Sequence, residues 1–161
     1  VLQDVFLFSD TLRNNVTLYA DGVEQHRLDA AAKAVGADEF IRKLPEGWGQ
    51  NVRERGELLS VGQRQLIAFM RAYLAQPAIL VLDEATSSID SESEQLIQRA
   101  TAAITKNRTS LIVAHRLSTI RHANRIIVLD QGKLIQSGTH DELMGEEGMY
   151  QDLVFSQTEV D

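Results

Sequence analysis

The sequence predicts an α/β protein with a parallel sheet, and two features of the 161-residue chain support this prediction. Residues 79–82 read Ile-Leu-Val-Leu, an aliphatic run expected of a strand that is buried on both faces. From this run onward, candidate strands alternate with candidate helices, and a strand–helix–strand order favours parallel pairing. The first 75 residues, by contrast, are typical of helices and loops.

The helices of this first part follow from apolar spacing and from proline. Helical periodicity predicts helices over Thr11–Tyr19 and Val23–Val35, and Pro45 closes a third over Ala37–Leu44. A longer helix is expected from Val61 to about residue 75. Its buried stripe should consist of Leu66, Phe69, Met70, Tyr73 and Leu74.

The second half continues the alternation of strands and helices. After the first strand, a helix is expected from Ser91, which has capping-box spacing to Glu94. Asp130-Gln131-Gly132 is a hairpin signal. The remaining expected elements are a strand at Ser110–Ala114, a short helix at Leu117–His122, strands at Arg125–Leu129 and Lys133–Ser137, a short helix capped by Thr139 and a last helix over Tyr150–Phe155.

Composition places the chain among globular proteins, with 43% apolar and 24% charged residues. The net charge of -7 argues against nucleic-acid partners, because phosphate contacts need a basic face. The chain has no cysteine, which excludes disulfides and thiolate metal sites. No apolar run approaches the ~20 residues that span a bilayer, and no signal peptide is visible. The chain opens at Val1 in mid-pattern, so we expect a piece of a longer polypeptide.

Two adjacent carboxylates, Asp83 and Glu84, directly follow the aliphatic strand. Ligands of open α/β sheets bind at the carboxyl ends of the strands. Paired acids at such an end suit a magnesium ion and the water molecule beside it. The alternative interpretation is a core strand that runs into a solvated acidic turn, since short motifs also match by chance.

A second candidate site lies where the long helix begins, at Leu59-Ser60-Val61-Gly62-Gln63. Ser60 is a good N-cap, and the unpaired amides of a first helical turn attract an anion such as phosphate. Gly62 lets a ligand approach the backbone closely. The alternative is that Ser60 merely caps a structural helix.

His115 and Gln3 are single residues, and only their positions in the sequence suggest a function for them. His115 follows an aliphatic strand and would lie beside Asp83 if the two strands are neighbours, where its ring donates to a phosphate oxygen. The alternative is that this lone histidine is an ordinary surface residue or a core residue whose hydrogen bonds are satisfied. Gln3 alone is nearly uninformative. Phe6 and Phe8, which follow it, fit either a core or an exposed docking patch.

Together, in this order, these pieces resemble the nucleotide-binding domain of an ATP-binding cassette (ABC) transporter over about residues 1–157. The segment from Leu59 to Gln63 resembles the signature motif, and Ile79–Glu84 resembles the Walker B strand with its catalytic glutamate. Ser87-Ser88-Ile89-Asp90 resembles the D-loop, His115 the switch histidine, and Gln3 the Q-loop glutamine. Five matches in order are a specific combination.

The resemblance implies a partial P-loop NTPase (RecA-like) ABC ATPase core with an α-helical subdomain. The subdomain would cover about 10–75, the core part about 76–140, and a helical tail 141–161. Arg53–Glu57 resembles the X-loop of exporters and Phe6-Leu7-Phe8-Ser9 is also exporter-like. We therefore expect an exporter of drugs, lipids or peptides at the cytoplasmic face of the cell membrane.

The resemblance also implies the partners and the roles of the site residues. Two such domains form a head-to-tail dimer that holds ATP and Mg²⁺, next to a transmembrane domain. Catalysis would fall to Glu84, which polarises water, and His115, which contacts the γ-phosphate. The remaining roles are Asp83 for magnesium, Gln3 for sensing γ-phosphate or magnesium, Ser60, Gly62 and Gln63 for the partner's nucleotide, and Asp90 for coupling the two sites.

Two departures from the family pattern matter. Val61 stands where the family usually has glycine, and no phosphate-binding Gly-x-x-x-x-Gly-Lys-[Ser/Thr] loop occurs. We therefore expect this chain alone to hydrolyse ATP poorly or not at all. We also expect incomplete burial of the aliphatic strand, and hence aggregation or an intermolecular contact.

Two rival functions stay open at this point. One is a soluble ABC ATPase of the DNA-repair or translation type. The other is a degenerate, non-hydrolysing cassette that acts as a regulatory or dimerisation module, a reading that Val61 favours and that Glu84 and His115 oppose.

Overall fold

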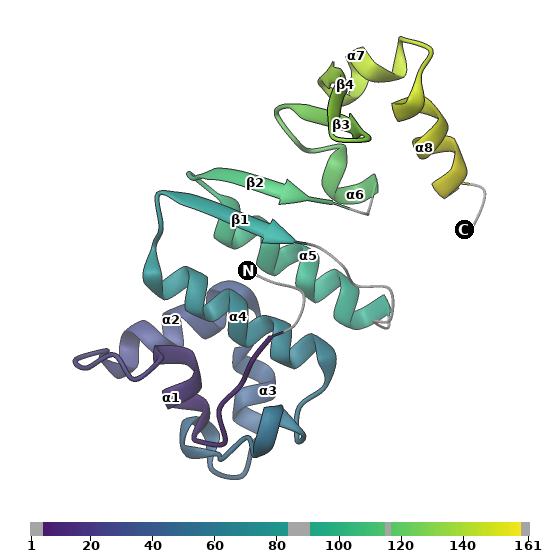
Figure 1. The fold of residues 1–161 in the computed structure, drawn as a ribbon. Coiled ribbons are helices and arrows are strands. Elements are labelled where there is room, and N and C mark those ends of the chain that lie inside the picture. The colour runs from purple at the N-terminus through teal and green to yellow at the C-terminus, as the bar shows by residue number, and fades with distance from the viewer. Residues whose placement is uncertain (1–4, 84–90, 115–116, 159–161) are drawn as a thin grey trace. The chain divides into compact units, whose positions relative to one another are not determined.

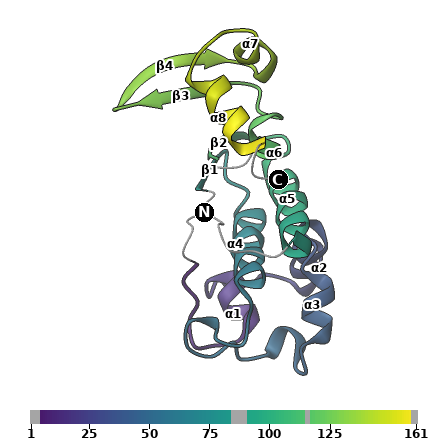
Figure 2. The same cartoon turned by 90° about the vertical axis from the view of Figure 1, so that its right-hand side faces the viewer.

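The computed structural model describes residues 5–83, 91–114 and 117–158 (Figures 1 and 2). The chain forms two units, Val1–Val113 and Ala114–Asp161, and each has its own apolar core. The first unit contains α1 Leu12–Thr17, α2 Gln25–Val35, α3 Asp38–Lys43, the short 3-10 helices η1 Gly47–Gly49 and η2 Glu54–Gly56, α4 Val61–Ala75, β1 Ile79–Asp83, α5 Ser91–Thr105 and β2 Thr109–Val113. The predicted elements are present, and their ends differ from the prediction by a few residues.

Helix α4 is the centre of the first unit and has the bounds that the sequence predicts. It ends where Gln76 adopts a left-handed conformation before Pro77. Leu66, Phe69 and Met70 are buried as predicted, whereas Tyr73 and Leu74 are half-buried. Helices α1, α2 and α5 all contact α4 (Figure 1), so its burial is much wider than one stripe. The buried residues outside the predicted stripe are Gly62, Gln65, Ile67, Ala68 and Ala72.

Strands β1 and β2 pair in parallel, as the alternating order predicts, with Asp83 opposite Val113. Leu80 and Leu82 are 4% and 2% exposed and join the core that the helices form. The prediction of burial on both faces is wrong, because Ile79 remains 66% exposed. Successive side chains of a strand point to opposite faces, and only one face of this sheet packs against the helical core. The exposed face agrees with the expectation of incomplete burial.

The second unit consists of α6 Leu117–Ile120, β3 Ile126–Asp130, β4 Lys133–Gly138, α7 His140–Met144 and α8 Met149–Thr158. The predicted hairpin joins β3 and β4, and Gln131 and Gly132 at its tip have φ of 46° and 77°. Positive φ at both central residues is typical of a two-residue hairpin turn. Thr139 caps α7 as predicted. In the described ranges, no helix is both long and apolar enough to cross a membrane.

Candidate nucleotide site

The first part of the candidate site is the N-terminus of α4. Ser60 Oγ accepts a 3.2 Å hydrogen bond from the Gln63 amide, and Gln63 Oε1 accepts a 3.0 Å bond from the Ser60 amide. This capping box satisfies two backbone donors. The amides of Val61 and Gly62 have no acceptor within the helix, because the first turn lacks a preceding one. The helix therefore presents two N–H groups and the positive end of its dipole at its N-terminal end, along the helix axis, which suits an anion.

Helix packing favours glycine at position 62, in addition to the predicted approach of a ligand to its backbone. A Cβ atom at this position would lie 3.2 Å from Ser93 Cβ on α5, so the glycine lets the two helix starts approach each other. Val61 is 51% exposed. Half of the valine side chain therefore lies at the surface of the helix start.

The loop before the helix is held against it and is locally strained. Arg64 Nη1 donates a 2.7 Å hydrogen bond to the Leu59 carbonyl, which fixes the residue before the cap. Arg53 and Arg55 both have positive φ, 61° and 52°, which is unusual for residues other than glycine. Such backbone costs about 1–3 kcal/mol per non-glycine residue and persists where the surroundings enforce it, often at functional sites.

The second part of the site is the carboxyl end of β1, where Asp83 is half-buried and pairs with Val113. The two parallel strands thus end level with each other. In the sequence Glu84 follows Asp83 directly, and His115 comes two residues after Val113.

The four predicted residues Gln3, Glu84, Asp90 and His115 lie outside the described residues. Asp83 supplies a carboxylate oxygen, the donor type that magnesium prefers, so this position fits the metal. Within the described part of the chain, no three His, Asp or Glu side chains form a metal-binding group.

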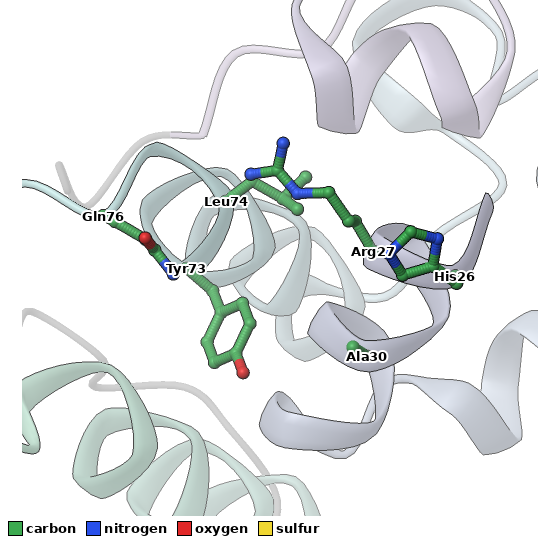
Figure 3. A pocket seen from close by; sticks show the side chains of 6 residues that line it. All are labelled: His26, Arg27, Ala30, Tyr73, Leu74 and Gln76. Atoms are coloured by element: carbon green, nitrogen blue, oxygen red, sulfur yellow. The ribbon is translucent and has the colours of Figure 1, made fainter. Parts of the chain in front are cut away.

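A pocket lies between α2 and the C-terminal end of α4 (Figure 3). Its volume is about 190 Å³, below the roughly 300–1,000 Å³ of ordinary ligand sites. It lies at the opposite end of α4 from Ser60, so it is separate from the candidate nucleotide site. Its lining residues are His26, Arg27, Ala30, Tyr73, Leu74 and Gln76.

The structure decides between the two readings of the early aromatic residues. Phe6 is 62% exposed and Phe8 39%, and together with Tyr19 they form an exposed aromatic patch. Ring centroids are 5.1 Å apart for Phe6–Phe8 and 5.7 Å for Phe8–Tyr19, both in edge-to-face geometry. Asp10 accepts a hydrogen bond of 2.9 Å from the Tyr19 hydroxyl and so orients the third ring. These residues are exposed and do not belong to the core, so the core interpretation is wrong.

Two polar residues that the sequence did not single out hold this segment in place. Asn15 is fully buried, and Arg71 reaches from α4 to the backbone of Phe6. Neither belongs to a short motif with a recognised mechanism. The only sequence signal was a charged residue on an otherwise apolar stretch of helix at residues 66–74.

Comparison with known proteins agrees with the predicted family. The family model described as ABC transporter matches residues 1–87, more than half of the chain. The ABC transporter ATP-binding protein YknV of Bacillus subtilis is 53% identical over 157 residues, which cover 98% of this chain and 26% of that protein. An ATP-dependent lipid A-core flippase of Legionella pneumophila (strain Paris) is 51% identical over 153 residues, covering 95% of this chain and 26% of the flippase.

A solved structure gives the same result for the fold. The structure of a bacterial Atm1-family ABC exporter with ATP bound matches with a TM-score of 0.85 and 41% identity, covering 96% of this chain and 27% of that chain. This chain therefore spans about a quarter of the length of these relatives. The predicted fold class, a partial ABC ATPase core of the P-loop NTPase type, is confirmed. The chain belongs to the ABC transporter family.

Proposed function

We propose that this chain is the later part of the ATPase domain of an ABC exporter, whose intact form couples ATP hydrolysis to export. The observation that supports this most is the level ending of β1 and β2, with Asp83 opposite Val113. Glu84 and His115 continue the chain just beyond these two strand ends. Relatives include a lipid A-core flippase and an Atm1-family exporter, which favours export over import.

In this proposal, the residues at the carboxyl ends of β1 and β2 bind magnesium and catalyse the hydrolysis of ATP. Glu84 orients and polarises the water that attacks the γ-phosphate, and His115 donates a hydrogen bond to a γ-phosphate oxygen. Asp83 holds Mg²⁺, directly or through water. Bound magnesium supplies charge neutralisation at the phosphate oxygens. The residues of the chain contribute position and electrostatic stabilisation, which are the main terms in phosphoryl transfer.

The start of α4 serves a second half-site. Ser60 and Gln63 complete their capping box within the chain, and the free amides of Val61 and Gly62 remain for a phosphate of ATP bound mainly by another copy. Such sharing needs a head-to-tail dimer of two ATPase domains. Asp90 couples the two half-sites.

The exposed aromatic patch faces a different partner in this proposal. Phe6 and Phe8 lie a few residues after Gln3, and with Tyr19, which follows α1, they form an exposed aromatic surface suited to a protein contact. We assign this surface to the transmembrane domain of the same transporter, at the cytoplasmic face of the membrane. A γ-phosphate or magnesium contact at Gln3 would then be passed along a short segment to that domain.

Replacement of the proposed base tests the mechanism. In the intact protein, Glu84→Gln should abolish ATP turnover and retain ATP binding, because the amide keeps the shape of the side chain and loses its basicity. The measurement is phosphate release beside nucleotide binding, with Glu94→Gln on α5 as the matched control. Turnover at the parent rate would refute the role of Glu84. The chain by itself should hydrolyse ATP poorly or not at all.

Two observations separate the rival functions from this proposal. Membrane-spanning segments encoded before Val1 favour transport, whereas a coiled-coil insertion or a second cassette favours a soluble ABC ATPase. For the degenerate cassette, the deciding result is nucleotide-dependent dimerisation of the intact protein without turnover.

A further inference from the structure

The Arg71 side chain joins three segments that are distant in sequence. It extends from α4, where its Nε donates a 2.7 Å hydrogen bond to the carbonyl of Asn15 at α1. Its Nη1 donates a 3.0 Å bond to the carbonyl of Phe6. A guanidinium has a planar fork of donors, so one side chain can bond both carbonyls in a fixed geometry.

Asn15 completes the connection from the other side. Its Oδ1 accepts a 2.8 Å bond from the Phe8 amide, and its Nδ2 donates 3.0 Å bonds to the carbonyls of Phe8 and Thr11. The side chain is fully buried, so each of these bonds would be costly to lose. The segment at residues 6–8 is therefore bonded through its backbone to both α1 and α4.

Placing a charged side chain at position 71 costs free energy that an apolar side chain in the same space would not cost. Its Nη2 atom is buried and has no hydrogen-bond partner within the described part of the chain. Burial lowers the pKa of the guanidinium below its usual range. An apolar residue of similar length would fill the same space without this cost. The charged group is therefore best explained by the two carbonyls that it holds.

These contacts connect two regions, near Gln3 and near Ser60, that in the proposed function belong to different half-sites and so contact different ATP molecules. Gln3 lies three residues before Phe6, and Ser60 caps the helix that carries Arg71. Along α4, Arg71 lies about 15 Å from the helix start, at 1.5 Å per residue. Helix α4 is continuous from Val61 to Ala75, so Ser60 at its N-cap and the segment at residues 6–8 are joined through Arg71 and one helix backbone.

We infer that Arg71, together with Asn15, is a positioning residue that ties the segment after Gln3 to the helix starting at Ser60, so that the two half-sites respond together. The inference rests on the proposed function for the two ends of this connection. The connection itself is a property of the described residues and can be tested separately.

The test uses Arg71→Lys, which keeps the charge and loses the fork, and Arg71→Met, which keeps the apolar stem. Arg42→Met, at an exposed position of α3, is the matched control. In this chain, hydrogen exchange of the Phe8 amide should rise about tenfold in both Arg71 variants and stay unchanged in the control. In the intact transporter, kcat for ATP should fall about tenfold or more with KM within about twofold, because geometry and not binding is lost.

Each outcome bears on a different claim. Unchanged exchange at Phe8 in both variants would overturn the connection itself. Faster exchange with unchanged kcat would overturn the coupling role and leave the assignment of Glu84 intact. If Glu84→Gln keeps parent turnover while exchange at Phe8 still rises in the Arg71 variants, the proposed function fails and the connection stands. If a variant has a lowered melting temperature, its kcat and its exchange at Phe8 are compared with the parent at equal fraction folded. This comparison distinguishes loss of the connection from general loss of stability.

Discussion

The helical region at residues 5–75 and the β1–β2 sheet differ in how completely they bury their apolar side chains. In the helical region, Leu12, Leu28 and Met70 are fully buried, because helices pack around α4 from several directions. In the sheet, Leu111 and Val113 are 58% and 50% exposed. The two strands are at least as aliphatic in sequence as the helices, so apolar composition alone does not determine burial. What decides it is whether a neighbouring element covers each face.

A matched pair of leucine substitutions gives the largest expected contrast. Leu66→Ala in α4 should lower the free energy of unfolding by about 2–5 kcal/mol, because it leaves a cavity in a closed core. Leu111→Ala on the exposed sheet face should change it by about 0.5 kcal/mol or less. Urea denaturation followed by circular dichroism measures both. An equal loss at the two positions, at a concentration where the chain is monomeric, would mean that another part of the same chain covers the sheet face.

Charge on the exposed sheet face should act on association more than on stability. We expect this chain to self-associate through its apolar sheet face, and Leu111→Lys should shift it toward monomer. The matched control is Leu58→Lys, at a residue 48% exposed outside the sheet. Sedimentation velocity over a concentration series measures the change. A parent chain that stays monomeric and binds no dye for apolar surface would contradict this expectation.

Loss of the α4 cap should have a smaller effect, confined to the helical region. Ser60→Ala removes the acceptor of the Gln63 amide and should cost about 1 kcal/mol of unfolding free energy. Thr139→Ala, which removes the corresponding cap of α7, is the matched variant in the second unit. Hydrogen exchange should rise in the first turn of α4 for one variant and in α7 for the other. Exchange that rises throughout the chain in both would show that the caps are not local.

The smallest expected effect is a pH dependence at Asp10. Its pKa is lowered, chiefly by a hydrogen bond from the Thr11 amide and further by bonds from Asn14 and Tyr19. A lowered folded-state pKa stabilises the fold above the unfolded value of 3.8, and this contribution is lost as the pH falls through the folded pKa. Asp10→Asn should therefore reduce the loss of stability on acidification from about pH 5. Asp21→Asn, in an exposed turn, is the control, and urea midpoints across this range are the measurement.

Most elements of the fold were predictable because their signals are local. Ser60 and Thr139 cap their helices through bonds to residues three positions later, and the Gln131-Gly132 turn needs only positive φ. The candidate site residues were likewise proposed from an ordered set of short motifs, each of which lies within one segment. The exposed face of β1 and the wide burial of α4 were not predictable from periodicity, because each depends on which elements pack against it.

By itself, the sequence determined the family, the alternation of strands and helices, and the residues that face a nucleotide in the proposal. These depend on side-chain type and spacing along one segment. Only the tertiary structure decided that Phe6 and Phe8 are exposed and that Arg71 bonds the Phe6 carbonyl. This bond joins residues 65 positions apart, and no local pattern in the sequence indicates which backbone carbonyl the half-buried guanidinium will reach.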